Sequence, residues 1–175
     1  APLTDCFRIM HGEEVHPKGG SYFHIVSLNA DRHVTEVFEQ RPDYAATEVD
    51  RILTQRDLSA CPDPRAAAIR LFIVDEIHRA GGFAVLAHPA KYGLSATNTR
   101  YLIEIFAQFG GDAVELPPAV DPSSTRQMVD RMIAEHRLKV SIGSDFHGDH
   151  MPWIRLGNVP SLKPGQVGIW ESFVD

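Results

Sequence analysis

The sequence predicts an α/β protein whose sheet is mainly parallel. Three helix-to-strand units follow one another between residues 65 and 145, and glycine pairs at 81–82 and 110–111 end two of the helices. Helices that alternate with short apolar strands are typical of a parallel sheet with crossover helices. Such sheets carry their functional side chains at the carboxyl ends of the strands.

The N-terminal part is expected to supply two further strands and a helix. Residues 7–16 read as a short strand that runs into a glycine-containing turn, and residues 21–29 as a mostly apolar strand. A helix is predicted over 44–56, where apolar residues recur at helical spacing.

The repeating part predicts three helices, each followed by a strand. The helices are expected over 65–80, 97–109 and 121–137, and the strands over 83–89, 112–118 and 138–145. Asp63 before Pro64 fits the start of the first of these helices. Residues 151–175 form a tail with little regular pattern, and without a repeat or linker the chain is expected to form one domain, 1–175.

Composition and charge exclude several classes of protein. The formal net charge of −6 argues against a broad basic surface for a long polyanion, but it allows a small phosphorylated substrate or a short RNA. No apolar run approaches the roughly 20 residues that span a bilayer, and no signal-peptide pattern occurs, so we expect no membrane partner and a cytoplasmic protein. Cys6 and Cys61 form no CxxC motif, and free thiols are favoured over a disulfide.

Histidine and carboxylate residues gather where the predicted strands end. The chain has nine histidines in 175 residues. A parallel sheet would bring several ligand types to one rim. These strand-end residues are Glu13, Glu14, His16, His24, His88, Glu115, Asp145 and His147. Mixed histidine and carboxylate ligands favour zinc, manganese or iron, so the pattern predicts a metal site.

Each of these residues also has a structural explanation when taken alone. A histidine within a strand, such as His24, fits a hydrogen-bonded core residue, Glu14 fits a solvated carboxylate, and Asp145 fits a turn cap. His33 lies in a polar loop with no partner in view, and His78 fits a solvated helix face. The metal site is favoured because separate strands each deliver a ligand type to the same predicted face.

A set of ordered motifs resembles the polymerase-and-histidinol-phosphatase (PHP) superfamily. The motifs are GEEV, FHIVSL, VLAHPAKYGLS, GGDAVEL, GSDFH and PWIRLG. The likeness is most specific over residues 82–170 and points to the TrpH-like branch, which includes ribonuclease AM and nucleotide bisphosphate phosphatases. It implies a distorted (β/α)7 barrel with its metal ions at the carboxyl-end rim.

The resemblance also implies roles for individual residues. Glu14 resembles the carboxylate that bridges two metals, and Glu14 and Asp145 are expected to be catalytic. The expected ligands to one to three Zn, Mn or Fe ions are Glu14, His24, His88, Asp145 and His147. Beside these, Lys91 and Arg155 are candidates to neutralise a substrate phosphate, although each equally fits a surface charge.

The chain departs from the superfamily at its start. The HxHxxxSDG and DHD-type motifs with which the family opens do not occur, so the predicted barrel is incomplete at the N-terminus. An open sheet edge would then need cover from the tail or another chain. Two explanations stay open: the chain lacks an N-terminal segment of a longer protein, or it is a short member that binds one metal or none and pairs with another subunit, for example as a homo-oligomer.

Two functions follow from these observations. The first is a metal-dependent phosphoesterase that hydrolyses phosphate esters of nucleotides or RNA ends by metal-activated water, as a phosphatase or a 5′-to-3′ exoribonuclease. The alternative is a degenerate or truncated PHP module without catalysis, in a structural or regulatory role. A metal amidohydrolase is a weaker third reading, because it also needs an N-terminal HxH.

Overall fold

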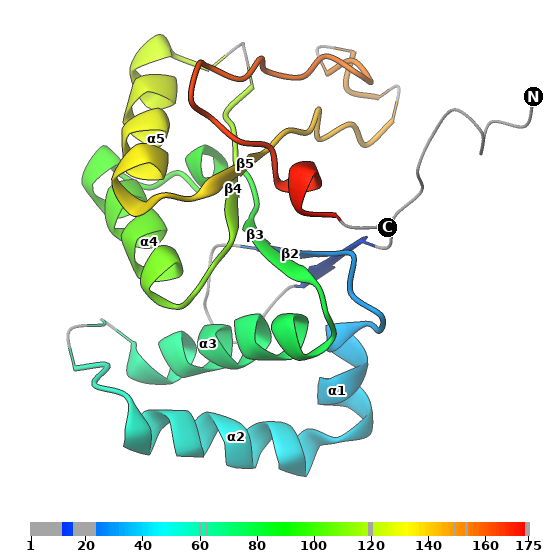
Figure 1. Cartoon of the computed structure of the whole chain (residues 1–175), viewed down its shortest axis with the longest axis vertical. Helices are drawn as coiled ribbons and strands as arrows, with labels where there is room; N and C mark the ends of the chain where they lie inside the picture. Colours follow the sequence, from blue (N-terminus) through cyan, green and yellow to red (C-terminus); the bar gives the residue numbers. More distant parts are fainter. Residues whose placement is uncertain are drawn as a thin grey trace, which may run out of the picture. The chain divides into compact units, whose positions relative to one another are not determined.

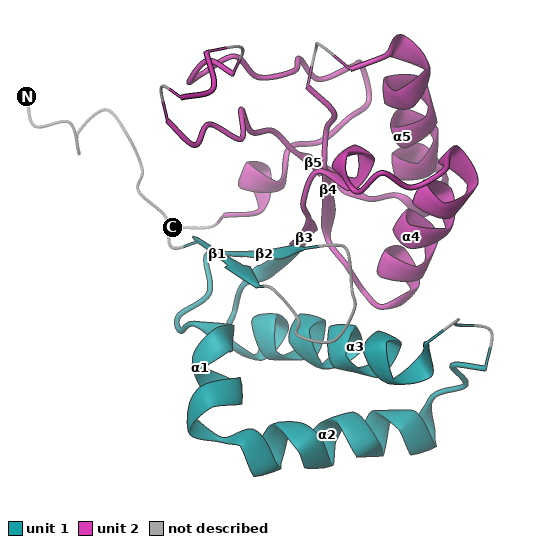
Figure 2. Cartoon of the chain, turned by 180° about the vertical axis from the view of Figure 1, so that it is seen from behind, with its two compact units in different colours: residues 1–84 teal, residues 85–175 magenta. Residues whose placement is uncertain are grey.

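The chain divides into two compact units, residues 1–84 and 85–175 (Figure 2). The computed structural model describes residues 12–15, 24–59, 61, 63–118, 121–148, 150–152 and 154–173. The first half of the strand predicted over 7–16, and also Cys6 and His16, lie outside the described residues. That the chain forms one domain stays a prediction.

The two strands of unit 1 pair antiparallel, which corrects one expectation. β1 (Gly12–Val15) pairs with β2 (Ile25–Leu28), and Glu14 lies opposite Val26. The mainly parallel sheet predicted from the sequence does not extend to this pair. The connection between the strands is too short for the crossover of a dozen or more residues that parallel neighbours need. His24 lies immediately before β2 rather than inside it.

Three helices complete unit 1. α1 (Val34–Gln40) was not expected from the sequence, whereas α2 (Pro42–Gln55) and α3 (Pro64–Arg79) confirm the predicted helices. α2 and α3 pack side by side (Figure 1). Asp63 accepts the N–H of Ala66 at 2.9 Å, which satisfies one of the unpaired donors at the start of α3.

Unit 2 contains the parallel strands that the sequence predicted. β3 (Phe83–Leu86), which begins at the end of unit 1, pairs parallel with β4 (Ala113–Glu115), and β4 pairs parallel with β5 (Lys139–Ser141). Each strand is shorter than predicted: β3 ends before His88 and β5 before Asp145, whereas β4 ends at Glu115. The described strands of neither unit close into a barrel, so the complete (β/α)7 barrel is not observed.

Helices and a returning tail cover the rest of unit 2. α4 (Ala96–Gln108) and α5 (Ser123–His136) lie side by side, and a short 3-10 helix, η2 (Pro89–Lys91), follows β3 (Figure 1). The tail returns to β5, where Val140 forms a parallel bridge with Gly168 just before the 3-10 helix η3 (Ile169–Ser172). Among the described residues, no helix combines the length and apolar character that crossing a membrane requires.

Candidate metal centre

The ends of the three parallel strands of unit 2 carry a cluster of polar side chains. His88 follows β3, Glu115 ends β4, and Asp145 and His147 follow β5. Because β3, β4 and β5 are parallel neighbours, these residues leave the sheet at the same edge. The expectation that the last three strands deliver their polar residues to one edge is therefore confirmed.

Asp145 is held ionised by a lysine. Lys91, at the end of η2, donates a hydrogen bond to Oδ2 of Asp145. Burial alone would raise the pKa of Asp145, but the hydrogen bond and charge of Lys91, helped by His88 and His147, outweigh burial and lower that pKa. An ionised carboxylate can bind a metal or accept a proton.

His147 has one ring nitrogen committed to the backbone. Its Nδ1 lies 2.8 Å from the carbonyl oxygen of Asp145 and 3.6 Å from that residue's Oδ1. A carbonyl oxygen only accepts, so Nδ1 carries the proton and Nε2 is the nitrogen that can bind a metal. The side chain is 62% exposed, which leaves room for a ligand.

Two residues of this cluster have unusual backbone conformations. His88 has φ of 27° and Asp145 has φ of 52°, both in the left-handed region that residues other than glycine seldom adopt. Each such conformation costs about 1–3 kcal/mol and persists only where surrounding contacts hold it. Strain of this kind gathers at functional sites, which agrees with the chemistry of these side chains.

Unit 1 holds a second pair of ligand types. Oε1 of Glu14 contacts Nδ1 of His24, and both side chains are about one-third exposed. Successive residues of a strand point to opposite faces, so Glu13 points away from this pair. Glu13 instead accepts the N–H groups of Val34 and Thr35 at 2.7 and 3.0 Å and caps α1.

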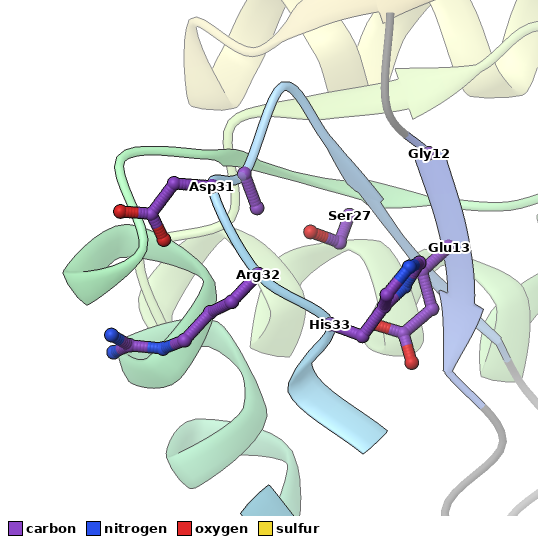
Figure 3. A pocket seen from close by; sticks show the side chains of 7 residues that line it. Gly12, Glu13, Ser27, Asp31, Arg32 and His33 are labelled. Carbon is purple, nitrogen blue, oxygen red and sulfur yellow. The ribbon is translucent and has the colours of Figure 1, made fainter. Parts of the chain in front are cut away.

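Glu13 also explains a histidine that the sequence left without a partner. Nδ1 of His33 lies 3.8 Å from Oε2 of Glu13, so the reading of His33 as a loop residue without a partner is wrong. Glu13 and His33 are among the residues that line a hollow of about 60 Å³ (Figure 3). A water molecule occupies about 30 Å³ in the liquid, so the hollow is too small for a nucleotide.

The two ligand groups fit a divalent metal by their chemistry. Carboxylate oxygens and imidazole nitrogens are present in both, and all are at least partly exposed. This donor set suits zinc, manganese or iron and contains no thiolate. A larger hollow of about 590 Å³ in unit 2, over the end of α5 and residues 163–167, has no histidine in its described lining.

Two further residues complete the account of the site, Arg155 and Glu115. Arg155 is exposed, and the described part of the chain shows no ion pair for it. Sequence reasoning noted Glu115 as a strand-end residue but gave it no role; the structure shows that its carboxylate accepts the backbone N–H of His88 at 3.0 Å.

Comparison with known proteins identifies relatives of part of the chain. No family model matches. The chain is 40% identical over 100 residues to the 5′-3′ exoribonuclease Rnm of Salmonella typhimurium, which covers 57% of this chain and 34% of that protein. It is 41% identical over 98 residues to the Rnm protein of Escherichia coli, covering 56% and 33%.

A third relative has a different name. The chain is 32% identical over 92 residues to the 3′,5′-nucleoside bisphosphate phosphatase of Chromobacterium violaceum, covering 53% of this chain and 32% of that protein. The chain thus spans about a third of the length of the curated relatives it matches.

Two solved structures share the fold. An amidohydrolase from Chromobacterium violaceum, with bound sulfate and no metal, has a TM-score of 0.58 at 21% identity, covering 93% of this chain and 75% of that one. A protein named as a metal-dependent phosphoesterase from Bifidobacterium adolescentis has a TM-score of 0.55 at 18% identity, covering 89% and 73%. At these identities the likeness concerns the fold alone. Over the matched part of the chain, the curated relatives, named as exoribonucleases and a bisphosphate phosphatase, confirm the resemblance read from the sequence. The solved structures add a shared fold.

Proposed function

We propose that the chain is part of a metal-dependent phosphoesterase that hydrolyses phosphate esters of nucleotides or RNA ends. The observation that carries the proposal is the cluster at the carboxyl ends of β3, β4 and β5, where His88, Asp145 and His147 lie with Lys91. Relatives named as an exoribonuclease and a bisphosphate phosphatase support the same class of reaction.

The proposed ligands are the two groups described above. They are Glu14 and His24 in unit 1 and His88, Asp145 and His147 in unit 2, for one to three Zn, Mn or Fe ions. When bound, such ions polarise phosphate oxygens and lower the pKa of a coordinated water. The lowered pKa of Asp145 suits a ligand or a proton acceptor better than a proton donor.

Two cations are proposed to bind the substrate phosphate. The ammonium of Lys91 lies within the cluster beside Asp145, so a phosphate held by Lys91 would lie next to the ionised carboxylate. Arg155 is exposed in the segment that follows this cluster and is the second candidate. Nucleotide bisphosphates and short 5′-phosphorylated RNA are the substrates to test first, because the relatives are named as a 3′,5′-nucleoside bisphosphate phosphatase and a 5′-3′ exoribonuclease.

The second candidate function is a PHP module without catalysis, which the missing HxH and DHD-type motifs favour for these 175 residues taken alone. Metal content separates the two. Elemental analysis of the purified chain is expected to find about two Zn, Mn or Fe ions. Glu14→Gln is expected to lose metal because Glu14 is the carboxylate of the proposed ligand group in unit 1. Glu13→Gln is the matched control, because the adjacent carboxylate caps α1 and should leave metal content unchanged. One ion or fewer, with no difference among the three samples, would favour the module without catalysis.

A further inference from the structure

Glu115 makes two contacts with the same histidine. Its Oε2 accepts the backbone N–H of His88 at 3.0 Å and lies 3.5 Å from Nδ1 of the His88 ring. Both side chains are only 15% exposed. One carboxylate oxygen thus contacts both the main chain and the imidazole of a proposed metal ligand.

The backbone of His88 needs such support. With φ of 27° and ψ of 56°, His88 is in the left-handed region. The residue after it is Pro89, and the ring of a proline disfavours helical conformations at the preceding position. The hydrogen bond from the His88 N–H to the Glu115 carboxylate is a contact that stabilises this unfavourable backbone conformation.

A glycine on the next strand's end leaves space for the carboxylate. A Cβ at Gly143 would lie 2.9 Å from Oε1 of Glu115, closer than non-bonded atoms approach. Oε1 is the end of a flexible side chain, so a methyl group at this position would displace the carboxylate rather than the backbone. Three neighbouring strand ends therefore act together: β5 leaves the space, β4 supplies the carboxylate, and β3 supplies the histidine.

We propose that Glu115 is a positioning residue that holds His88 in its metal-binding orientation. Metal-bound histidines commonly have a carboxylate or carbonyl beside the second ring nitrogen, and loss of such a partner lowers metal affinity about 10–100-fold. The inference rests on the proposed function, because it takes His88 to be a metal ligand. It assigns Glu115 a role that acts through His88 and not through contact with substrate.

Co²⁺ titration of the purified chain, followed by visible absorption, tests the proposal. Glu115→Ala is expected to weaken Co²⁺ binding about 10–100-fold. Glu115→Gln keeps an oxygen for the His88 N–H and is expected to recover part of the loss. Gly143→Ala should weaken binding in the same direction, because it displaces the carboxylate without removing it.

A double-mutant cycle distinguishes positioning from a general structural role. In a His88→Ala background, Glu115→Ala should weaken Co²⁺ binding no further, because the residue through which it acts is gone. Equal losses in both backgrounds would overturn the proposal, as would unchanged Co²⁺ affinity in Glu115→Ala. If His88→Ala alone leaves Co²⁺ binding unchanged, it is instead the ligand assignment in the proposed function that fails. Thermal unfolding of each metal-free variant identifies any that do not fold, and Glu115→Gln then carries the test.

Discussion

At the scale of single residues, Lys91 has two possible roles, because it forms an ion pair with Asp145 and is also a candidate phosphate ligand. As a phosphate ligand, Lys91 would act on substrate binding. As the partner of Asp145, it keeps the pKa of that carboxyl low. Both effects come from one charge, and they separate in a kinetic experiment because they change different quantities.

Lys91→Met is therefore expected to lower kcat/KM on a phosphate ester about 10–100-fold, the loss of one hydrogen bond to a charged group. Without Lys91, burial dominates and the pKa of Asp145 rises, so the acid limb of the pH–rate profile should move to higher pH. Arg131→Met, which removes an exposed cation of α5, is the matched control. A shifted acid limb with an unchanged KM would mean that Lys91 acts on Asp145 alone.

At the scale of secondary-structure elements, two polar side chains hold helix ends and the tail in place. Asp63 caps α3, the longest helix of unit 1, whose buried face includes Phe72. In unit 2, Asp130 of α5 accepts hydrogen bonds from Arg126 and Gln166 and forms an ion pair with Lys163. These contacts of Asp130 join α5 to the segment that leads back to β5.

Asp63→Ala should destabilise unit 1 by about 1 kcal/mol, the usual loss when a helix N-cap is removed. Asp63→Asn keeps an oxygen for the Ala66 N–H and should retain most of the stability. Urea unfolding followed by circular dichroism measures both variants. If Asp63→Asn and Asp63→Ala lose the same free energy of unfolding, the charge of Asp63, and not its hydrogen bond to the Ala66 N–H, is what stabilises α3.

Asp130→Asn should destabilise unit 2 by about 1–3 kcal/mol at pH 7, because its cationic partners lose a charge-assisted bond. Burial raises the pKa of Asp130, but bonds from Lys163, Arg126 and Gln166 outweigh it and lower that pKa. A depressed folded-state pKa gives stability that is present above the unfolded-state value, about 3.9, and is lost as pH falls through the folded-state value. The gap between wild type and variant should therefore close in acid.

Urea unfolding at pH 7 and near pH 3 measures that gap. Glu135→Gln, an exposed acid of the same helix, is the control and should change little at either pH. A gap of the same size at both pH values would contradict the ionic account of Asp130.

At the scale of the whole molecule, metal binding should couple to stability. Any ion that binds the folded chain but not the unfolded chain stabilises it, by about 2.7 kcal/mol at a concentration 100-fold above Kd. For a chain of this length each kcal/mol raises Tm by about 2–4 °C, so saturating Mn²⁺ should raise Tm by roughly 5–10 °C.

Differential scanning calorimetry with Mn²⁺, and then with excess chelator, measures the effect. The variant Asp145→Asn should lose most of the Mn²⁺-dependent rise in Tm. Glu135→Gln is again the matched control, since it removes an exposed acid of α5 that is not among the proposed ligands. An equal rise in all three proteins would point to non-specific binding by a chain of net charge −6.

The sequence by itself determined the helices α2 to α5 and the parallel strands of unit 2, and also the residue types at the ends of those strands. Helical periodicity, Asp63 before Pro64, and the glycine pairs at 81–82 and 110–111 are local signals, and local signals were enough for α2 to α5. The motifs also sufficed for the resemblance to PHP-type proteins, which the relatives confirm. The predicted ends of these strands lie several residues beyond the observed ends. A residue just beyond the last backbone hydrogen bond of a strand has the same sequence pattern as a residue within the strand.

Only the tertiary structure decided which partner each polar side chain has. Glu13 and Glu14 are adjacent in sequence, yet one caps α1 and the other contacts His24, because a strand turns alternate residues to opposite faces. The bonds of Glu115 to His88 and of Lys91 to Asp145 join residues 27 and 54 positions apart. Such pairs depend on strand register and on left-handed turns, which are set by packing across the sheet and leave no local pattern in the sequence.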